Sequence, residues 1–435
     1  MTQNAQRIPR SAAILIATRG LSSIGTTLTS FGLDVWVFRR TGSYGTFALL
    51  AVLTSLPVLL FAPFAGMLTD RIDKKKLLIA ADLVSASGVA LALILYLTDA
   101  LSVTVVALTT VLLSSASELR WSSMSAMFSR VLPRELLGRV SGIQQAIRGV
   151  NVMLGPLLGA IGLDLLGLPT LLGLDVLTYA LSMAAWLAVR VDTRSDSRAP
   201  GEPKPSFLEE FTYGFRWVWR QPGLRRLLMF FMIVNIGVSI FTAAFSPYLL
   251  SFADNRMLAA SLGVLGAGAF LCGVYIGKRS SAIGSHESNI VMGTLLFGLG
   301  MFLWGVCRHP ALLLPVAFFI GVMETVIMSA SQTAWQLHVP ANIQGKVFAV
   351  RTVTAFGLAP LALLCSVPLA DRVFRPMLTQ AGAFASTTWG AAPTGPLGMM
   401  VSMLGLSVAA CAGVLQFSGG LRLAPDTIAA EAKGS

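Results

Sequence analysis

Long apolar runs alternate with short polar and charged segments along almost the whole chain. Crossing the hydrocarbon core of a bilayer as a helix takes about 20 consecutive, mostly apolar residues, and the chain offers twelve such runs. They are residues 12–38, 45–68, 77–97, 102–128, 139–164, 168–190, 224–252, 257–279, 288–307, 311–337, 345–370 and 397–420. The pattern predicts an all-α membrane protein with twelve transmembrane helices.

Four of these runs carry a stripe of polar residues at helical spacing, which predicts a helix face turned toward water inside the bilayer. The first run has Arg19 below the stripe Ser23, Thr26, Thr27, Ser30 and Asp34. The fourth has Ser114, Ser117, Glu118, Trp121, Ser122 and Ser125. The seventh has Asn235, Ser239, Thr242 and Ser246, and the tenth has Glu324, Met328, Ser331, Gln332 and Trp335.

A shift of 207 residues relates the two halves of the chain, carrying Gly66 onto Gly273 and Arg71 onto Lys278. Two copies of one membrane unit predict a pseudo-symmetric pair of six-helix bundles with a central site between them. Residues 191–205 hold three prolines and too little apolar content to pack. The residues that follow have one apolar face, which predicts an interfacial helix. The expected domains are 1–190, a cytoplasmic linker at 191–223, and 224–435.

Composition supports a membrane protein, because 55% of residues are hydrophobic, 12% are charged and the mean hydropathy is +0.74. The net charge of +12 does not indicate nucleic-acid binding, since the basic residues lie in alternate loops.

By the positive-inside rule both termini are expected in the cytoplasm, and the protein is expected in the cytoplasmic membrane. The four cysteines lack metal-ligand spacing and no phosphate-binding loop appears. We therefore expect no metal, no cofactor and no direct ATP drive.

Between the second and third runs the chain reads Gly66-Met67-Leu68-Thr69-Asp70-Arg71, then Ile72-Asp73 and three lysines. Gly66 allows two helices to approach closely, and Asp70 at a helix end can cap another helix or form an ion pair. This spacing resembles the loop signature of the major facilitator superfamily, and the resemblance covers nearly the whole chain. Asp73 replaces the commoner glycine. That departure resembles the drug:proton antiporter branch, which contains macrolide and siderophore exporters.

The fifth run contains Gly155, Pro156 and Gly159. They resemble the Gly-x-x-x-Gly-Pro-x-x-Gly-Gly pattern of many antiporters of this superfamily, although Asn151 and Ala160 replace two of the glycines. Such residues would bend the helix and thin its surface so that the two halves can close. Ordinary tight packing explains them equally well. The resemblance also implies that the first, fourth, seventh and tenth helices line the central cavity, and these are the four with polar stripes.

Glu118 and Glu324 are the central ionisable candidates. A charge near the bilayer centre costs at least about 2.5–3.5 kcal/mol, so such groups face a cavity or a partner. Each carboxyl is expected to carry a proton or to pair with a cationic cargo, and the alternative is a structural ion pair with Arg120, Arg148 or Arg351.

For Asp34 the alternatives are a proton entry point or a solvated rim residue, and for Arg19 the alternatives are a place in the cavity or a packing role. Asp82 and Asp175 are expected to be partners of buried arginines.

Trp121, Trp335 and Met328 would suit a flat or lipophilic cargo, or they are packing residues. The sequence thus predicts a monomeric secondary transporter that exports an antibiotic, siderophore or peptide-like metabolite by proton antiport, and so contributes to antibiotic resistance. Its partners would be the cargo, protons and the bilayer. The alternative within transport is an uptake permease or a lysophospholipid transporter. An enzyme is not expected, because the three histidines lie in separate loops without a shared motif.

Overall fold

The secondary structure is helical across the described residues of this computed structural model, which are 8–41, 44–189, 207–250, 252, 253, 255–279, 285–340, 342–380, 389, 395–418, 420, 421 and 423. The helices are α1 Arg10–Thr41, α2 Tyr44–Arg71, α3 Lys74–Leu97, α4 Val103–Val131, α5 Arg134–Leu165, α6 Gly167–Ala188, α7 Phe207–Arg220, α8 Pro222–Leu250, α9 Asn255–Arg279, α10 His286–Val306, α11 Pro310–His338, α12 Gln344–Phe356, α13 Ala359–Leu369, α14 Arg375–Gln380 and α16 Gly395–Phe417. A π-helical segment, η2 Ala370–Phe374, joins α13 to α14. Residues 191–206, the first stretch of the predicted linker, lie outside the described residues.

Most of the predicted runs coincide with single helices, namely α1 to α6, α8 to α11 and α16. Within the described residues, eight helices are long and apolar enough to cross a membrane. These are α3, α4, α6, α8, α9, α10, α11 and α16. The all-helical membrane architecture that the sequence predicted is therefore confirmed.

The eleventh predicted run, 345–370, is divided into α12 and α13 by a turn at residues 357 and 358. Pro360 accounts for the break. A proline has no amide hydrogen to donate to the carbonyl four residues earlier, and in a continuous helix its ring would clash with that carbonyl. Beyond α13 the chain continues as η2 and α14, so helix extends into the stretch 371–396 that the sequence placed between the last two spans.

The helices form two compact units, and each unit draws on both halves of the sequence. The first unit comprises Met1–Leu137, Leu154–Arg220 and Gln336–Val353, and the second comprises Gly138–Met153, Gln221–Trp335 and Thr354–Ser435. Most of α12 thus packs with the first unit, and the amino-terminal half of α5 with the second. The domain boundaries at 190 and 224 remain a prediction about the sequence repeat.

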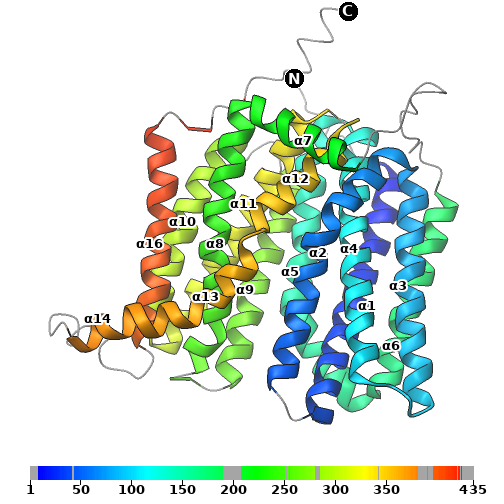
Figure 1. Cartoon of the computed structure of the whole chain (residues 1–435), viewed down its shortest axis with the longest axis horizontal. Coiled ribbons are helices and arrows are strands. Elements are labelled where there is room, and N and C mark those ends of the chain that lie inside the picture. Colours follow the sequence, from blue (N-terminus) through cyan, green and yellow to red (C-terminus); the bar gives the residue numbers. More distant parts are fainter. Residues whose placement is uncertain are drawn as a thin grey trace, which may run out of the picture. The chain divides into compact units, whose positions relative to one another are not determined.

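In the first unit, α1, α3, α4 and α6 pack against one another (Figure 1). Their inward faces carry the buried residues Leu33, Val37, Val89, Val106, Leu172 and Tyr179. These residues form one apolar core, which holds the four helices in register. The polar residues described below are therefore fixed on rigid elements.

In the second unit, α10 and α16 make the most extensive helix contact, with α8 beside them (Figure 1). A Cβ on Gly298 would lie 2.5 Å from the carbonyl oxygen of Gly405, so these two backbones meet directly. Phe245 of α8 stacks on Trp304 of α10 with 4.4 Å between ring centroids. Close backbone contact and aromatic stacking make this three-helix group rigid.

Candidate functional site

Asp70, in the last turn of α2, caps the start of α12. Its Oδ1 accepts a hydrogen bond from the backbone N–H of Gly345 and its Oδ2 accepts one from the N–H of Lys346, both at 3.0 Å. The first N–H groups of a helix have no partner within that helix and carry partial positive charge, so a carboxylate stabilises them. Asp70 therefore fastens α12 to α2 across 275 residues of sequence.

Gly66, one turn before Asp70, makes this attachment sterically possible. A Cβ on Gly66 would overlap the backbone carbonyl of Gly345, and a Cβ on Gly345 would lie 2.5 Å from Oδ1 of Asp70. The packing leaves no room for a side chain at either position. The two glycines and the carboxylate thus act as one contact between α2 and α12.

The residues after Asp70 organise the turn into α3. Asp73, which stands where the commonest signature has glycine, is the N-cap of α3 and accepts a hydrogen bond from the N–H of Lys76 at 3.1 Å. Lys75 donates to the carbonyl of Val189 at 3.0 Å, at the end of α6. Arg71 is exposed. The departure at residue 73 therefore replaces a flexible turn residue with a helix cap.

The glycines of α5 face two different neighbours. Gly155 and Gly159 lie against Thr27 and Phe31 of α1, and Pro156 belongs to the same stretch of helix. Gly142 and Gly149 instead lie against the backbone of α9, at Gly277 and Phe270. Sequence reasoning missed Gly149. Its signal was the seven-residue spacing from Gly142, which puts both glycines on one helix face.

Glu118 is buried on α4, with 8% of its surface exposed. Its carboxyl interacts electrostatically with the guanidinium of Arg351, on α12. Arg351 is only partly buried, and its guanidinium lies 5.9 Å from the ring centroid of Phe348. The Glu118 carboxyl is therefore largely shielded from water. The positive charge that it attracts is that of Arg351 on α12, the helix that Asp70 caps.

Glu324 has a different environment. It forms an ion pair with Arg148 of α5 at 2.5 Å, and the two side chains are 24% and 54% exposed. This is one of the ion pairs that the sequence offered as the alternative to proton or cargo binding. Glu118 and Glu324 are 206 residues apart, close to the shift of 207 that relates the two halves. Their environments nevertheless differ, because only Glu324 forms a short ion pair with a partly exposed arginine.

The remaining predicted cavity residues differ in exposure. Ser117 and Asp34 are half-buried, and Trp121 is 41% exposed. Gln332 and Trp335 are 2% and 1% exposed.

Two helices use their polar stripes for packing within the units. Asn235 of α8 donates to the carbonyl of Ala355 on α12 at 3.0 Å, whereas Ser239 donates to the carbonyl of Asn235 within α8 itself, at 2.7 Å. Ser125 contacts the amide of Gln336 at 3.3 Å. Polar spacing alone therefore does not separate a residue that faces water from one that ties two helices together.

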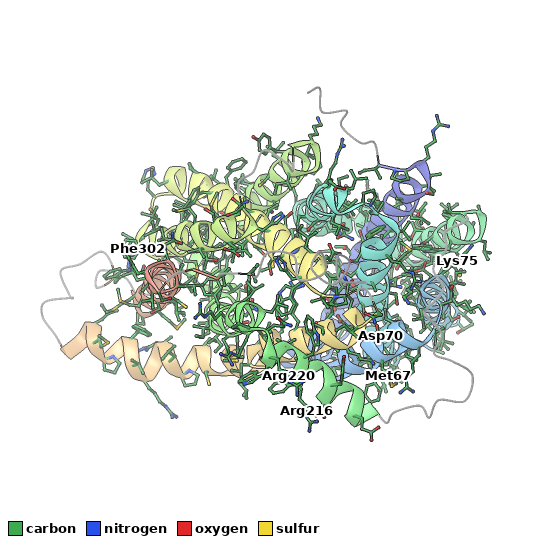
Figure 2. All side chains as sticks on the ribbon, turned by 90° about the horizontal axis from the view of Figure 1, so that it is seen from above. Met67, Asp70, Lys75, Arg216, Arg220 and Phe302 are labelled. Carbon is green, nitrogen blue, oxygen red and sulfur yellow. The ribbon has the colours of Figure 1, made fainter. Side chains whose placement is uncertain are left out.

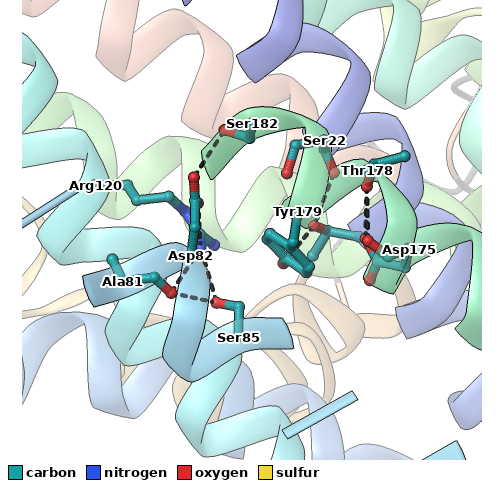
Figure 3. Close-up of polar contacts among 10 residues, drawn as sticks. Ser22, Ala81, Asp82, Ser85, Arg120, Asp175, Thr178, Tyr179 and Ser182 are labelled. Carbon is teal, nitrogen blue, oxygen red and sulfur yellow. Dashed lines mark hydrogen bonds and ion pairs between the residues drawn. The ribbon is translucent and has the colours of Figure 1, made fainter. Parts of the chain in front are cut away.

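A buried charge cluster lies inside the first unit (Figure 3). Arg120 of α4 donates to Oγ of Ser85 at 2.7 Å and pairs with Asp82 at 3.3 Å, and both charged side chains are at most 2% exposed. The other carboxylate oxygen of Asp82 accepts a hydrogen bond from Ser182 at 2.7 Å. Asp82 is thus the partner of a buried arginine, as the sequence predicted.

The cluster continues toward α1 through Tyr179 and Asp175 of α6. The Tyr179 hydroxyl lies 2.7 Å from Oγ1 of Thr26, and Asp175 accepts a hydrogen bond from Thr178 at 3.3 Å (Figure 3). Arg19 of α1 interacts electrostatically with both aspartates. Two guanidiniums and two carboxylates therefore balance in charge, which lowers the cost of burying them.

This cluster predicts a large loss of stability on Asp82→Asn. The change removes the carboxylate that pairs directly with the buried guanidinium of Arg120, and breaking a buried ion pair from one side costs about 3–5 kcal/mol. The matched control is Asp164→Asn, because Asp164 pairs with Arg39 at 3.5 Å while both side chains are more than 60% exposed, and such pairs contribute about 0–1 kcal/mol. Free energies of unfolding in detergent micelles compare the two variants. Equal losses would show that burial of the Asp82 pair has no energetic consequence.

A pocket in the second unit is bordered by none of the predicted cavity residues. It is lined by Gly138, Ile276, His286, Asn289, Val326, Ser329, Ala330 and Thr333. Across the described residues, no group of three or more His, Cys, Asp or Glu side chains is placed to hold a metal ion.

Comparison with known proteins places the chain among transporters. The profile of the Major Facilitator Superfamily matches residues 15–364. Macrolide efflux protein A of Streptococcus pyogenes is 25% identical over 372 residues, which cover 82% of this chain and 88% of that protein. The multidrug efflux pump Tap of Mycobacterium tuberculosis is 24% identical over 378 residues, covering 85% and 88%.

Two solved structures share the fold. A bacterial homologue of the iron transporter ferroportin, in an outward-facing state, aligns over 94% of this chain and all of its own with a TM-score of 0.69 and 13% identity. The human organic anion transporter MFSD10 aligns over 93% of this chain and all of its own, with a TM-score of 0.61 and 13% identity. Because the family profile matches most of its length, this chain belongs to the major facilitator superfamily, as a multi-pass secondary transporter of small molecules and not an enzyme.

Proposed function

We propose that this chain exports a small amphipathic or lipophilic compound, such as an antibiotic, a siderophore or a peptide-like metabolite, in exchange for protons. The two relatives named above are efflux proteins, one for macrolides and one for several drugs. Alternating exposure of a central site to the two sides of the membrane would move the compound. The termini and the Asp70 contact would lie on the cytoplasmic side, where the basic loops are expected.

The observation that carries the proposal is that two carboxylates, those of Asp70 and Glu118, interact with α12. Asp70 binds its first turn, and Glu118 attracts Arg351, six residues or about 9 Å further along the helix. An ionised Glu118 attracts the guanidinium, whereas a protonated Glu118 does not. Binding of one proton would therefore loosen α12, which links protonation to helix movement.

Energetics favour Glu118 over Glu324 as the coupling carboxyl. Glu324 already has a charged hydrogen-bond partner, the guanidinium of Arg148. Glu118 has no ion pair at that range among the described residues, and it is more buried. One proton moving down a membrane potential of 100 mV releases about 2.3 kcal/mol, which corresponds to more than a tenfold cargo gradient. Asp34 would serve as the proton entry, and Trp121 would contact an apolar cargo.

Inside-out membrane vesicles test the proposal directly. A strain lacking the protein is first screened against toxic compounds and native metabolites, and a compound to which it is hypersensitive is then offered to vesicles containing the protein. We expect accumulation inside the vesicles when their lumen is acidic, and collapse of that accumulation when a protonophore is added. Accumulation that is the same with and without the proton gradient would contradict proton antiport. Movement in the opposite direction would indicate an uptake permease.

A further inference from the structure

The helix α7 presents two contrasting faces. Gly214 and Val218 are buried, while Tyr213, Phe215 and Trp219 are 50%, 38% and 42% exposed. Arg216 and Arg220, one turn apart, are also exposed. In the part of the chain that the structure describes, neither arginine has a hydrogen-bond or ion-pair partner. The outward face of α7 therefore combines aromatic rings with two available guanidiniums.

The buried face of α7 rests on the junction between α2 and α12. The helix runs across the ends of these two helices (Figure 1), and Figure 2 shows its two arginines together with Asp70 and Met67 of α2. A Cβ on Gly214 would lie 2.8 Å from the carbonyl oxygen of Lys346, and the ammonium of Lys346 lies 5.4 Å from the Tyr213 ring centroid. Lys346 is the residue whose N–H Asp70 binds. A force on α7 therefore acts on the capped end of α12.

The position of α7 along the chain places its outward face at the depth of lipid headgroups. Arg220 is two residues before Pro222, where the candidate membrane span of α8 begins. Two residues correspond to only a few ångströms. Phe215 and Trp219 stack with 5.0 Å between ring centroids. Aromatic rings beside arginines are the composition of helices that lie in the membrane interface.

We propose that the outward face of α7 binds the phosphate groups of anionic phospholipids and that this binding stabilises the Asp70 cap on α12. Guanidiniums bind phosphate oxygens in a bidentate manner, and each basic residue near an anionic bilayer contributes about 1 kcal/mol of attraction. The stacked aromatic pair anchors the helix in the interface, which a soluble acidic protein or free phosphate would not require. The lipid binding depends on neither the cargo nor proton coupling, so it can fail while the export proposal stands.

Lipid binding is tested with the double variant Arg216→Gln/Arg220→Gln of the full chain. The matched control is Arg39→Gln/Arg40→Gln, which removes two exposed arginines from the far end of α1. Mass spectrometry counts phosphatidylglycerol molecules that remain bound after purification from vesicles of phosphatidylcholine and phosphatidylglycerol. We expect at least threefold less bound phosphatidylglycerol in the α7 variant and no change in the control. Equal retention by both variants would overturn the proposal.

A competition arm separates lipid from free anion. Millimolar inorganic phosphate is expected to leave the bound phosphatidylglycerol in place, because phosphate lacks the acyl chains that hold the lipid against Phe215 and Trp219. Displacement of the lipid by phosphate would mean that α7 is an anion site and not a lipid site. An acidic peptide that displaces the lipid at micromolar concentration would likewise overturn the lipid assignment in favour of a protein partner.

Hydrogen exchange at the α12 start tests the coupling. In phosphatidylglycerol vesicles, peptides containing Gly345 and Lys346 should exchange at least threefold more slowly than in pure phosphatidylcholine. That difference should vanish in the α7 double variant and persist in the α1 control. An Asp70→Asn variant shows how fast these amides exchange without the carboxylate cap. Equal exchange in the two lipids for the unaltered protein would refute the coupling.

Discussion

Replacing Glu118 with glutamine is expected to reduce proton-driven transport to background while the protein stays folded. Glutamine has the shape of a protonated glutamate but cannot lose a proton, so α12 would stay in the state with Arg351 released. We expect the fold to survive because glutamine matches glutamate in size and can still donate and accept hydrogen bonds at residue 118. Gradient-driven accumulation in inside-out vesicles measures the loss, and the thermal unfolding temperature measures folding.

Two further variants give this prediction its control and its mechanism. Glu135→Gln removes an exposed carboxylate at the start of α5 and should transport normally. Arg351→Gln removes the positive charge that Glu118 attracts. It should also uncouple transport from the proton gradient, although Glu118 can still bind and release a proton. Undiminished proton-driven transport by Glu118→Gln would refute the role assigned to Glu118. Normal coupling by Arg351→Gln would refute the release of α12 as its means.

The helices could be predicted from sequence because their signal is local. Apolar runs of sufficient length gave the twelve predicted segments, and the ends of α3 and α10 agree with the predicted runs within three residues. The break between α12 and α13 could have been found as well, since Pro360 sits inside the apolar run. Hydropathy averages over such a residue, and only its effect on backbone hydrogen bonding reveals the turn.

The contacts of the candidate site were beyond sequence reasoning because they join distant segments. The motif indicated that Asp70 could cap or pair, but nothing local identifies the amides of Gly345 and Lys346 as its partners. The same holds for Glu118, for which the sequence offered Arg120, Arg148 and Arg351 as ion-pair partners. Arg120 is taken by Asp82 inside the bundle and Arg148 by Glu324, so Arg351 is left for Glu118. A single chain reveals the residue types, whereas the fold decides the pairs.

Gly66→Ala is expected to lower transport by roughly fivefold or more, because a methyl group at residue 66 cannot coexist with the carbonyl of Gly345. Overpacking of this kind costs about 1–3 kcal/mol. If this cost applies only to the state in which α2 and α12 are in contact, the equilibrium between the two states shifts by about 5- to 150-fold. The variant should favour the state in which α2 and α12 are apart, and peptides containing Gly345 should exchange their amide hydrogens faster.

The matched control is Gly173→Ala on α6, where a Cβ would meet no other atom within 4 Å. Alanine in a helix interior is favoured over glycine by about 1 kcal/mol, so this variant should be at least as stable as the unaltered protein and transport within twofold of it. The same substitution thus has opposite expected effects at the two positions, because only Gly66 faces another backbone. If both variants transport alike, the approach of α2 to α12 at Gly66 is not a step of the transport cycle, and the capping of α12 by Asp70 would serve stability alone.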